Sequence, residues 1–408
     1  MRILVEVSWG IGNMVQGTPL CRALRLLGHE VDLFLNNDRL ADAVAPLFAE
    51  WDAVAKVFTR ATEIDFASYD VGICCFGEHL TATRMPPGFW YDFGWYNLRG
   101  RNEAELNLRP ARLLGYTGPL PPSHVHCSDR DFELEPGTVV LHAGCDPANT
   151  AKRWPHWGEV CKRLQACGNP VVIVGTDADR STSNWEAAWR CEFNLPLTDV
   201  AALLKQATAY MGNDSGVGHI AAAVGVPGVL LYGPSEPVKN APNSKVLRQL
   251  IAPAQDGEGR QLTTGPVVPV ERLSLSEVWA AVEAVLEDPQ RDPARELPAP
   301  ADEPVVPDIS GPPPKPSIET ADSMEEWLQE LTTWHARQLM TTDNRDDVLR
   351  AGIREAARAH LRLSSLWRRE PGGVASAQAS FHAKAAMRAG APMRGFAARV
   401  INRLSRGR

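Results

Sequence analysis

The sequence lacks the cysteine spacings that build zinc sites and disulfide frameworks. It has eight cysteines and no C-x-x-C pair among them. We therefore expect no metal site, no disulfide framework, and reduced thiols of the kind found in the cytosol. The cysteines are Cys21, Cys74, Cys75, Cys127, Cys145, Cys161, Cys167 and Cys191.

Long apolar runs and a leader segment are missing as well. No apolar stretch approaches the length that spans a membrane. The first seven residues read as a strand and lack a charged n-region, an apolar h-region and a small-residue cleavage site, which excludes a secretory signal. With 44% hydrophobic and 22% charged residues, the composition predicts a globular cytoplasmic protein.

Excess positive charge is absent from the chain as a whole. The formal net charge is -7 and the pI is near 5.9, which argues against a partner such as nucleic acid. Residues 371–408 differ, because they hold seven Lys and Arg and no acidic residue. Residues 395–408 within this stretch form a basic amphipathic pattern, which suits either an anionic membrane surface or a solubilising tail.

The chain opens with a strand, a glycine loop and a helix. Residues 2–7 predict the strand, and residues 9–13 the loop. Thr18 is placed to cap the helix and Pro19 to occupy its first position. The strand signal returns at residues 30–35, 54–58 and 71–76, with a helix expected over 39–50. This alternation is typical of a doubly wound α/β domain.

A second α/β unit follows a proline-rich boundary. Strand patterns occupy residues 138–141, 171–174 and 229–232, and helices are expected over 184–190 and 198–205. A further helix after Pro155 should bury Trp157, Val160, Cys161 and Leu164. Two facing α/β domains, 1–130 and 131–288, explain this pattern better than one long sheet.

The remainder of the chain changes character after a helix over 276–287. Residues 289–317 are rich in proline and predict an extended linker. Residues 324–369 carry aromatic and leucine side chains at helical spacing, which predicts a helical hairpin. Residues 318–408 would therefore form a helical extension with a basic tail.

The most informative stretch is MGNDSGVGHIAAAVGVP at residues 211–227. It predicts a strand over 207–211, a polar elbow over 212–218 and an apolar helix over 219–224 that Gly225 ends. Such an elbow directs backbone N–H groups and the positive end of a helix at one point, which suits a phosphate. The alternative is an ordinary strand-to-helix turn with an Asp N-cap.

Lys152 and Arg153 lie in another loop of the same domain. Taken alone, they are better explained as a solvated basic pair. The carboxyl ends of parallel strands meet at one rim, however, so this loop and the elbow should converge on a ligand that contains a diphosphate.

Four polar side chains near this rim have two explanations each. His219 either contacts a phosphate or packs inside the helix start, and Asp214 either orients ligand hydroxyls or caps the helix. Glu236 reaches the cleft or is a solvated turn residue, and His142 is a site residue or an interior histidine. The glycines at 10 and 12 do not match a dinucleotide fingerprint, and either admit a ligand in the cleft or simply form the turn.

These motifs together resemble a known family. HAG at 142–144, KRWP at 152–155, GNDSGVGHIAAAVGVP at 212–227 and LYGPSEP at 231–237 are similar to glycosyltransferase family nine, the heptosyltransferases. GIGNMVQGTPLCRALR at 10–25 is similar to that family's first loop and helix. The resemblance extends over about residues 1–290.

The resemblance implies a GT-B architecture, in which two Rossmann-like domains enclose the active site. It also implies inverting transfer of a sugar from a nucleotide donor, typically ADP-heptose, to a glycan or glycolipid acceptor without a required metal. Lys152 then matches the lysine on the donor phosphates, and Asp214 the acid near the donor sugar. The remaining donor-side positions are Gly144, Arg153, Asn213, Ser215, Gly216, His219 and Glu236.

One position departs from the family pattern. Many members have Gly-Asp in the first loop, with the Asp as base, whereas this chain has Gly12-Asn13, and Asn does not accept a proton at neutral pH. Either Glu78, His79 or Asp92 is the base, or Asn13 only positions the acceptor, or the protein is a non-catalytic nucleotide-sugar sensor or scaffold that recruits a partner through its helical tail.

Overall fold

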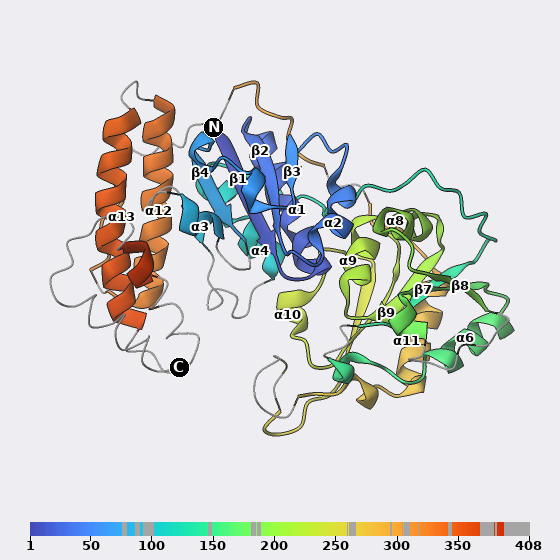
Figure 1. Cartoon of the computed structure of the whole chain (residues 1–408). Helices are drawn as coiled ribbons and strands as arrows, with labels where there is room; N and C mark the ends of the chain where they lie inside the picture. Colours follow the sequence, from blue (N-terminus) through green and yellow to red (C-terminus); the bar gives the residue numbers. More distant parts are fainter. Residues whose placement is uncertain are drawn as a thin grey trace.

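The chain folds into two parallel β-sheets covered by helices, with a pair of long helices at one side (Figure 1). The structure is a computed structural model. It describes residues 1–75, 80–85, 90–92, 102–145, 149–180, 185, 189–258, 260, 267–293, 296–303, 305, 311–317, 319–341, 345–367, 379 and 382–386.

The first sheet has the strand order β3-β2-β1-β4-β5, and its strands all run parallel. Its strands are β1 (Arg2–Ser8), β2 (Glu30–Asn36), β3 (Lys56–Phe58), β4 (Val71–Cys74) and β5 (Trp90–Asp92). The helices of this part are α1 (Ile11–Leu26), α2 (Ala41–Val44), α3 (Leu80–Arg84), α4 (Glu103–Asn107) and α5 (Arg109–Leu113), with short 3₁₀ turns η1 (Ala45–Phe48), η2 (Ala61–Glu63) and η3 (Phe66–Ser68).

The second sheet has the order β11-β10-β9-β6-β7-β8, again with parallel strands. Its strands are β6 (Val139–His142), β7 (Val171–Gly175), β8 (Arg190–Phe193), β9 (Ala209–Asn213), β10 (Gly228–Tyr232) and β11 (Leu247–Ile251). Its helices are α6 (Trp157–Ala166), α7 (Asp177–Arg180), α8 (Leu197–Gln206), α9 (Gly216–Ala223), α10 (Pro237–Asn240) and α11 (Leu275–Glu287), with 3₁₀ turns η5 (Thr150–Lys152) and η6 (Val270–Arg272). The predicted α/β class with two parallel sheets is confirmed.

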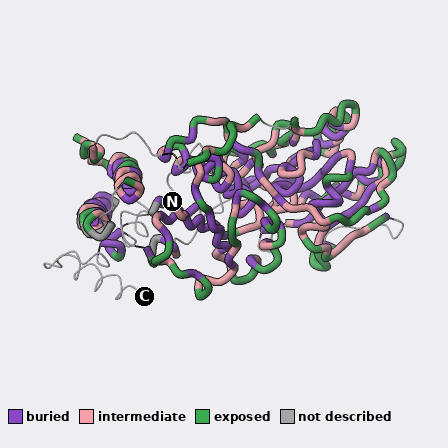
Figure 2. The backbone as a smooth tube through the Cα atoms, turned by 90° about the horizontal axis from the view of Figure 1, so that it is seen from above, coloured by how far each residue is buried: buried purple, intermediate pink, exposed green. Residues whose placement is uncertain are grey.

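Both sheets are buried on two faces, as parallel sheets require. Every residue of β9 and β10 is buried, and so is every residue of β1 after Arg2. Figure 2 shows buried backbone running through the interior of both sheets, with exposed backbone at the periphery. The apolar face predicted for α6 is confirmed, because its buried residues are Trp157, Val160, Cys161 and Leu164.

Helix α1 begins earlier than the sequence suggested. The predicted glycine loop is its first turn, since the helix starts at Ile11 with Gly10 as its N-cap. Pro19, expected at the first helical position, lies inside the helix. A proline there offers no N–H to the carbonyl of Val15, and the Thr18 hydroxyl donates to that carbonyl instead, at 2.6 Å. Thr18 therefore supplies the hydrogen bond that Pro19 cannot make, and it does not cap the helix.

The prediction of a helix over residues 184–190 is wrong at residue 190, because Arg190 begins strand β8. Residues 181–184 and 186–188 lie outside the described residues. Arg190 pairs with Val172 of β7, so the strand adds an edge to the sheet. Its half-exposed, polar sequence, RCEF, gave no apolar run that would have signalled a strand.

The proline-rich segment packs against the folded units. Its described residues form no helix or strand, in agreement with an extended segment. The backbone N–H groups of Ala301 and Val305 donate to the carbonyls of Leu26 and Leu27, at 2.8 and 2.9 Å. Arg291 donates to the carbonyl of Lys205 at 2.6 Å. The segment therefore leaves the second sheet's unit and returns along the end of α1.

The predicted helical hairpin is confirmed as α12 (Ala321–Thr341) and α13 (Arg345–Trp367). The pair lies beside the first sheet in Figure 1, and the hydroxyls of Tyr91 and Thr333 join β5 to α12 at 2.9 Å. In the described part of the chain, the structure contains no helix with the length and apolarity to cross a membrane. Residues 395–408 lie outside the described residues.

Candidate active site

The predicted elbow is tighter than expected. Strand β9 continues to Asn213, and helix α9 begins at Gly216, so Asp214 and Ser215 alone form the turn. Ser215, rather than Asp214, is the N-cap. Gly225 has a φ of +71° and follows the end of α9, as predicted. The shorter turn places the first N–H groups of α9 directly at the carboxyl edge of the sheet.

No side chain caps the first turn of α9. The Ser215 hydroxyl, which normally would cap it, instead lies 3.0 Å from Nδ1 of His142, at the end of neighbouring strand β6. Burial lowers the pKa of His142 to about 4, so its imidazole is neutral at pH 7. The start of α9 therefore has backbone N–H groups without a side-chain cap, an arrangement that suits an anion.

Lys152 meets Asp214 at this turn. Its Nζ lies 2.6 Å from Oδ2 of Asp214, and the two side chains are only 20% and 7% exposed. Lys152 follows β6 in η5, and Asp214 follows β9, so the two loops converge as predicted. The pair puts a cation beside the start of α9, where it can contact an anion together with the backbone N–H groups.

His219 connects the two halves of the molecule. Its side chain is 5% exposed, and burial lowers its pKa to about 4. A Cβ added to Gly12 would lie 2.6 Å from Cδ2 of His219, and one added to Gly216 would lie 2.7 Å from Cβ of Ile11. The first turns of α1 and α9 therefore pack against one another, and glycine is required on both sides. Gly10 has no such constraint, with ordinary 3.5 Å contact to Asn13.

Asn213 and Gly144 support this edge. The Asn213 amide donates to the carbonyl of Ala143 at 2.7 Å and accepts from Nε1 of Trp157 at 3.1 Å. A Cβ on Gly144 would lie 2.5 Å from Oδ1 of Asp179. Both polar ends of the Asn213 side chain are thus used within the protein, and its predicted contact with the donor stays a prediction.

The two other donor-side candidates lie at the same rim. Glu236 caps α10, where its carboxylate accepts the N–H of Val238 at 3.3 Å. Arg153 is half-buried beside Cys145 and contributes to lowering the pKa of that thiol, although burial dominates and raises it. Their contacts with a donor stay predictions.

Asn13 has a partner that the sequence did not indicate. Its Nδ2 lies 2.9 and 2.8 Å from the two carboxylate oxygens of Glu103, which is fully buried at the start of α4. Burial raises the pKa of Glu103 to about 7, although the Asn13 hydrogen bond and the charge of Lys239 oppose the shift. Glu103 is 90 residues from Asn13 in the sequence, and the residues before it have no clear periodicity. Only the folded structure therefore shows that the two residues are paired.

The base candidates named from sequence stay predictions. Glu78 and His79 lie outside the described residues. Asp92 ends strand β5, opposite Cys74 of β4. Among the described residues, no group of three or more His, Cys, Asp and Glu side chains is arranged to hold a metal ion.

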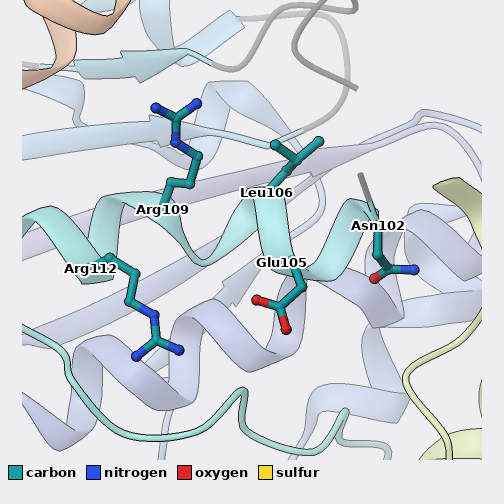
Figure 3. A pocket seen from close by; sticks show the side chains of 5 residues that line it. All are labelled: Asn102, Glu105, Leu106, Arg109 and Arg112. Atoms are coloured by element: carbon teal, nitrogen blue, oxygen red, sulfur yellow. The ribbon is translucent and has the colours of Figure 1, made fainter. Parts of the chain in front are cut away.

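An open depression lies on α4 and α5 and is lined by Asn102, Glu105, Leu106, Arg109 and Arg112 (Figure 3). Its volume is about 380 Å³. Its two guanidinium groups, of Arg109 and Arg112, point in opposite directions. Arg109 pairs with Glu326 at 3.8 Å, and Arg112 donates to the carbonyl of Tyr116 at 3.1 Å. The depression therefore does not direct two cations at one ligand.

Comparison with known structures identifies the architecture as GT-B. The glycosyl transferase family 9 protein from Veillonella parvula DSM 2008 superposes with a TM-score of 0.57 at 17% identity, over 70% of this chain and 97% of that one. The Escherichia coli ADP-heptose lipopolysaccharide heptosyltransferase II superposes with a TM-score of 0.54 at 21% identity, over 70% and 99%. The predicted GT-B fold is confirmed.

The family resemblance is also confirmed, for the second half of the folded part. Residues 120–263 match the model of glycosyltransferase family 9 (heptosyltransferase). Lipopolysaccharide heptosyltransferase 2 of Salmonella typhimurium is 33% identical over 134 residues, which are 30% of this chain and 38% of the relative. The Escherichia coli K12 protein of the same name is 36% identical over 110 residues, 24% and 32%. In these sequence matches, the chain thus spans less than two fifths of the length of the relatives.

Proposed function

We propose that the protein is a glycosyltransferase that transfers a heptose or a related sugar from a nucleotide donor to a glycan or glycolipid. The observation that carries the proposal is the Lys152–Asp214 pair beside the uncapped start of α9. These residues lie inside the segment that matches the heptosyltransferase family. Their placement suits the diphosphate of a nucleotide sugar.

The chemistry of sugar transfer requires what this site offers. When the bond between the anomeric carbon and the diphosphate breaks, negative charge develops on the leaving oxygen. A cation and a helix N-terminus stabilise that charge without a metal ion. We therefore propose metal-independent, inverting transfer with ADP-heptose as the first donor to test, and Asp214 near the donor sugar.

We place the acceptor at the start of α1, whose first turn packs against that of α9. A glycan of the cell surface, built on a lipid, is the acceptor class that the heptosyltransferase relatives suggest by name. We further propose a cytoplasmic protein that binds the inner face of the membrane peripherally through residues 395–408, whose basic amphipathic sequence motivates the idea.

Incubation with ADP-heptose tests the proposal. The protein should bind ADP in calorimetry and release ADP slowly from ADP-heptose even without an acceptor, with water taking the acceptor's place. Steady turnover would exclude a purely sensing or scaffolding role. Absence of binding to ADP and to every nucleotide sugar tried would overturn the proposal.

A further inference from the structure

The Asn13–Glu103 pair lies where an acceptor hydroxyl would approach. Asn13 belongs to the first turn of α1, which follows the carboxyl end of β1, and ligands of parallel α/β sheets bind at that edge. The two ends of its amide contact different groups. Nδ2 donates to the Glu103 carboxylate, and Oδ1 accepts the N–H of Gly10 at 3.2 Å. Oδ1 keeps a second lone pair, and Asn13 is only half-buried.

Glu103 interacts with elements of both α/β units. Asn13 contacts it from α1, and the Lys239 charge acts on it from α10 of the second unit. Its own charge reaches the Cys75 thiol at the end of β4, whose pKa it helps to raise. Asn102, the residue before it, donates to the carbonyl of Ala241 at 2.8 Å and so fixes the start of α4 to the segment after α10.

A carboxylate is a costly group to place here if its role is only structural. A buried charge costs several kcal/mol unless it is well paired. A neutral glutamine would accept the same Asn13 hydrogen bond without that cost. The cost is visible in the molecule, because burial raises the pKa of Glu103 to about 7. With this pKa the carboxyl is about half ionised at neutral pH, so the charged form is present at a cost that packing alone does not require.

We propose that Glu103 is a positioning residue for the acceptor: its carboxylate holds and polarises the Asn13 amide, whose Oδ1 accepts the hydrogen bond of the hydroxyl that attacks the donor sugar. As the new bond from the hydroxyl oxygen to the anomeric carbon forms, the bond to the diphosphate breaks, ADP leaves with its electron pair, and the proton of the hydroxyl is released to solvent. The physical reason is that an amide whose N–H donates to an anion is a stronger acceptor at its oxygen. Carboxylates behind a contacting side chain tune activity in this way in other sites. The inference rests on the proposed glycosyl transfer.

Glu103→Gln tests the inference with ADP-heptose as donor and water as acceptor. We expect kcat for ADP release to fall about 10- to 100-fold, while the KM for ADP-heptose stays unchanged. In the native protein, kcat should rise with pH through about 7, as Glu103 ionises, and the variant should lose this rise. Glu105→Gln is the matched control, because Glu105 is an exposed acid of the same helix. Its kcat and pH profile should equal those of the native protein.

A charge exchange separates this role from a structural one. Asn13→Asp alone sets two carboxylates about 3 Å apart, which forces them to share a proton. The double variant Asn13→Asp, Glu103→Gln restores one amide and one carboxylate in exchanged places, and should regain most of the lost kcat. Full activity and an unchanged pH profile in Glu103→Gln would overturn the inference.

A readout without turnover keeps the two proposals apart. If the native protein binds ADP but releases none from ADP-heptose, the proposed function fails. The Asn13 side-chain amide proton resonances then still test the pair. They should shift with pH through about 7 in the native protein and stay constant in Glu103→Gln. Resonances that do not move in the native protein would contradict the inference.

Discussion

The donor-side elbow and the first turn of α1 face one another, and they use charge in opposite ways. At the elbow, Lys152 and Asp214 form a partly accessible ion pair, and both neighbouring histidines are buried and neutral. At the start of α1, a neutral amide covers a fully buried carboxylate. One side presents a fixed cation, and the other holds an anion that titrates near neutrality.

Because of this difference, we expect the elbow to bind the donor and the start of α1 to act on the attacking hydroxyl. The elbow has the features of a site for a diphosphate, and it lies within the segment matched by the family model. The start of α1 lies outside that segment and carries the substitution of Asn for the family's Asp. The family match therefore covers the elbow and does not extend to the start of α1.

Loss of the Lys152 cation should give the largest effect. Lys152→Ala should reduce kcat for ADP release about 100- to 1000-fold, because one fixed group that stabilises the leaving charge is removed. The variant also leaves Asp214 without its Lys152 partner, so Lys152→Ala, Asp214→Asn separates loss of folding from loss of function. Lys162→Ala, in exposed Lys162 of the same domain, is the control. Unchanged turnover in Lys152→Ala would show that Lys152 does not stabilise the leaving group.

The buried carboxylate should make stability depend on pH. The pKa of Glu103 is about 7 in the folded protein against an ordinary value of 4.5, so its contribution to folding is complete below about pH 4.5 and is lost as the pH rises through 7. Urea unfolding at pH 5 and pH 8.5 should show the native protein losing up to about 3 kcal/mol relative to Glu103→Gln. A constant difference between the two proteins would mean that Glu103 does not titrate as the structure indicates.

Close packing of α1 on α9 predicts a steric effect. Gly12→Ala should cost about 1–3 kcal/mol of stability and weaken donor binding, because the new methyl group overlaps the His219 ring. Gly10→Ala is the control, and it should cost less than about 1 kcal/mol since its Cβ meets ordinary contact. Gly12→Ala, His219→Ala should recover stability. Failure to recover would show that the two helices are not in contact through this pair.

For the affinity of the protein for its donor we expect no change with pH. Affinity for ADP-heptose should stay constant from pH 6 to pH 8.5, because His142 and His219 both have pKa values of about 4 and stay neutral. Calorimetry over this range measures it, alongside the kcat profile. An affinity that changes with a midpoint near pH 7 would show that a titrating group contacts the donor, contrary to this expectation.

Sequence patterns predicted the elements whose signals are local. The apolar runs of β6, β7 and β10, the buried face of α6 and the α12–α13 hairpin follow from periodicity alone. The start of α1 was predicted wrongly because glycine and proline signals outweighed its apolar spacing. The compensation of Pro19 by the Thr18 hydroxyl is visible only once the helix is formed.

Site residues were predictable where they follow strands. Lys152 and Asp214 each follow a parallel strand, so the sheet rule placed them together. Glu103 follows no strand, and nothing in its neighbours distinguishes it from a surface acid on a short helix. Its burial arises from α1 on one side and α10 on the other, which only the assembled fold provides.

A structure of the protein with ADP bound is the most direct test of the central claim, that the elbow holds the donor diphosphate. We expect phosphate density within hydrogen-bond distance of Lys152 Nζ and the first backbone N–H groups of α9. ADP bound elsewhere, for instance in the depression beside Arg109 and Arg112, with the Lys152–Asp214 pair undisturbed, would contradict it.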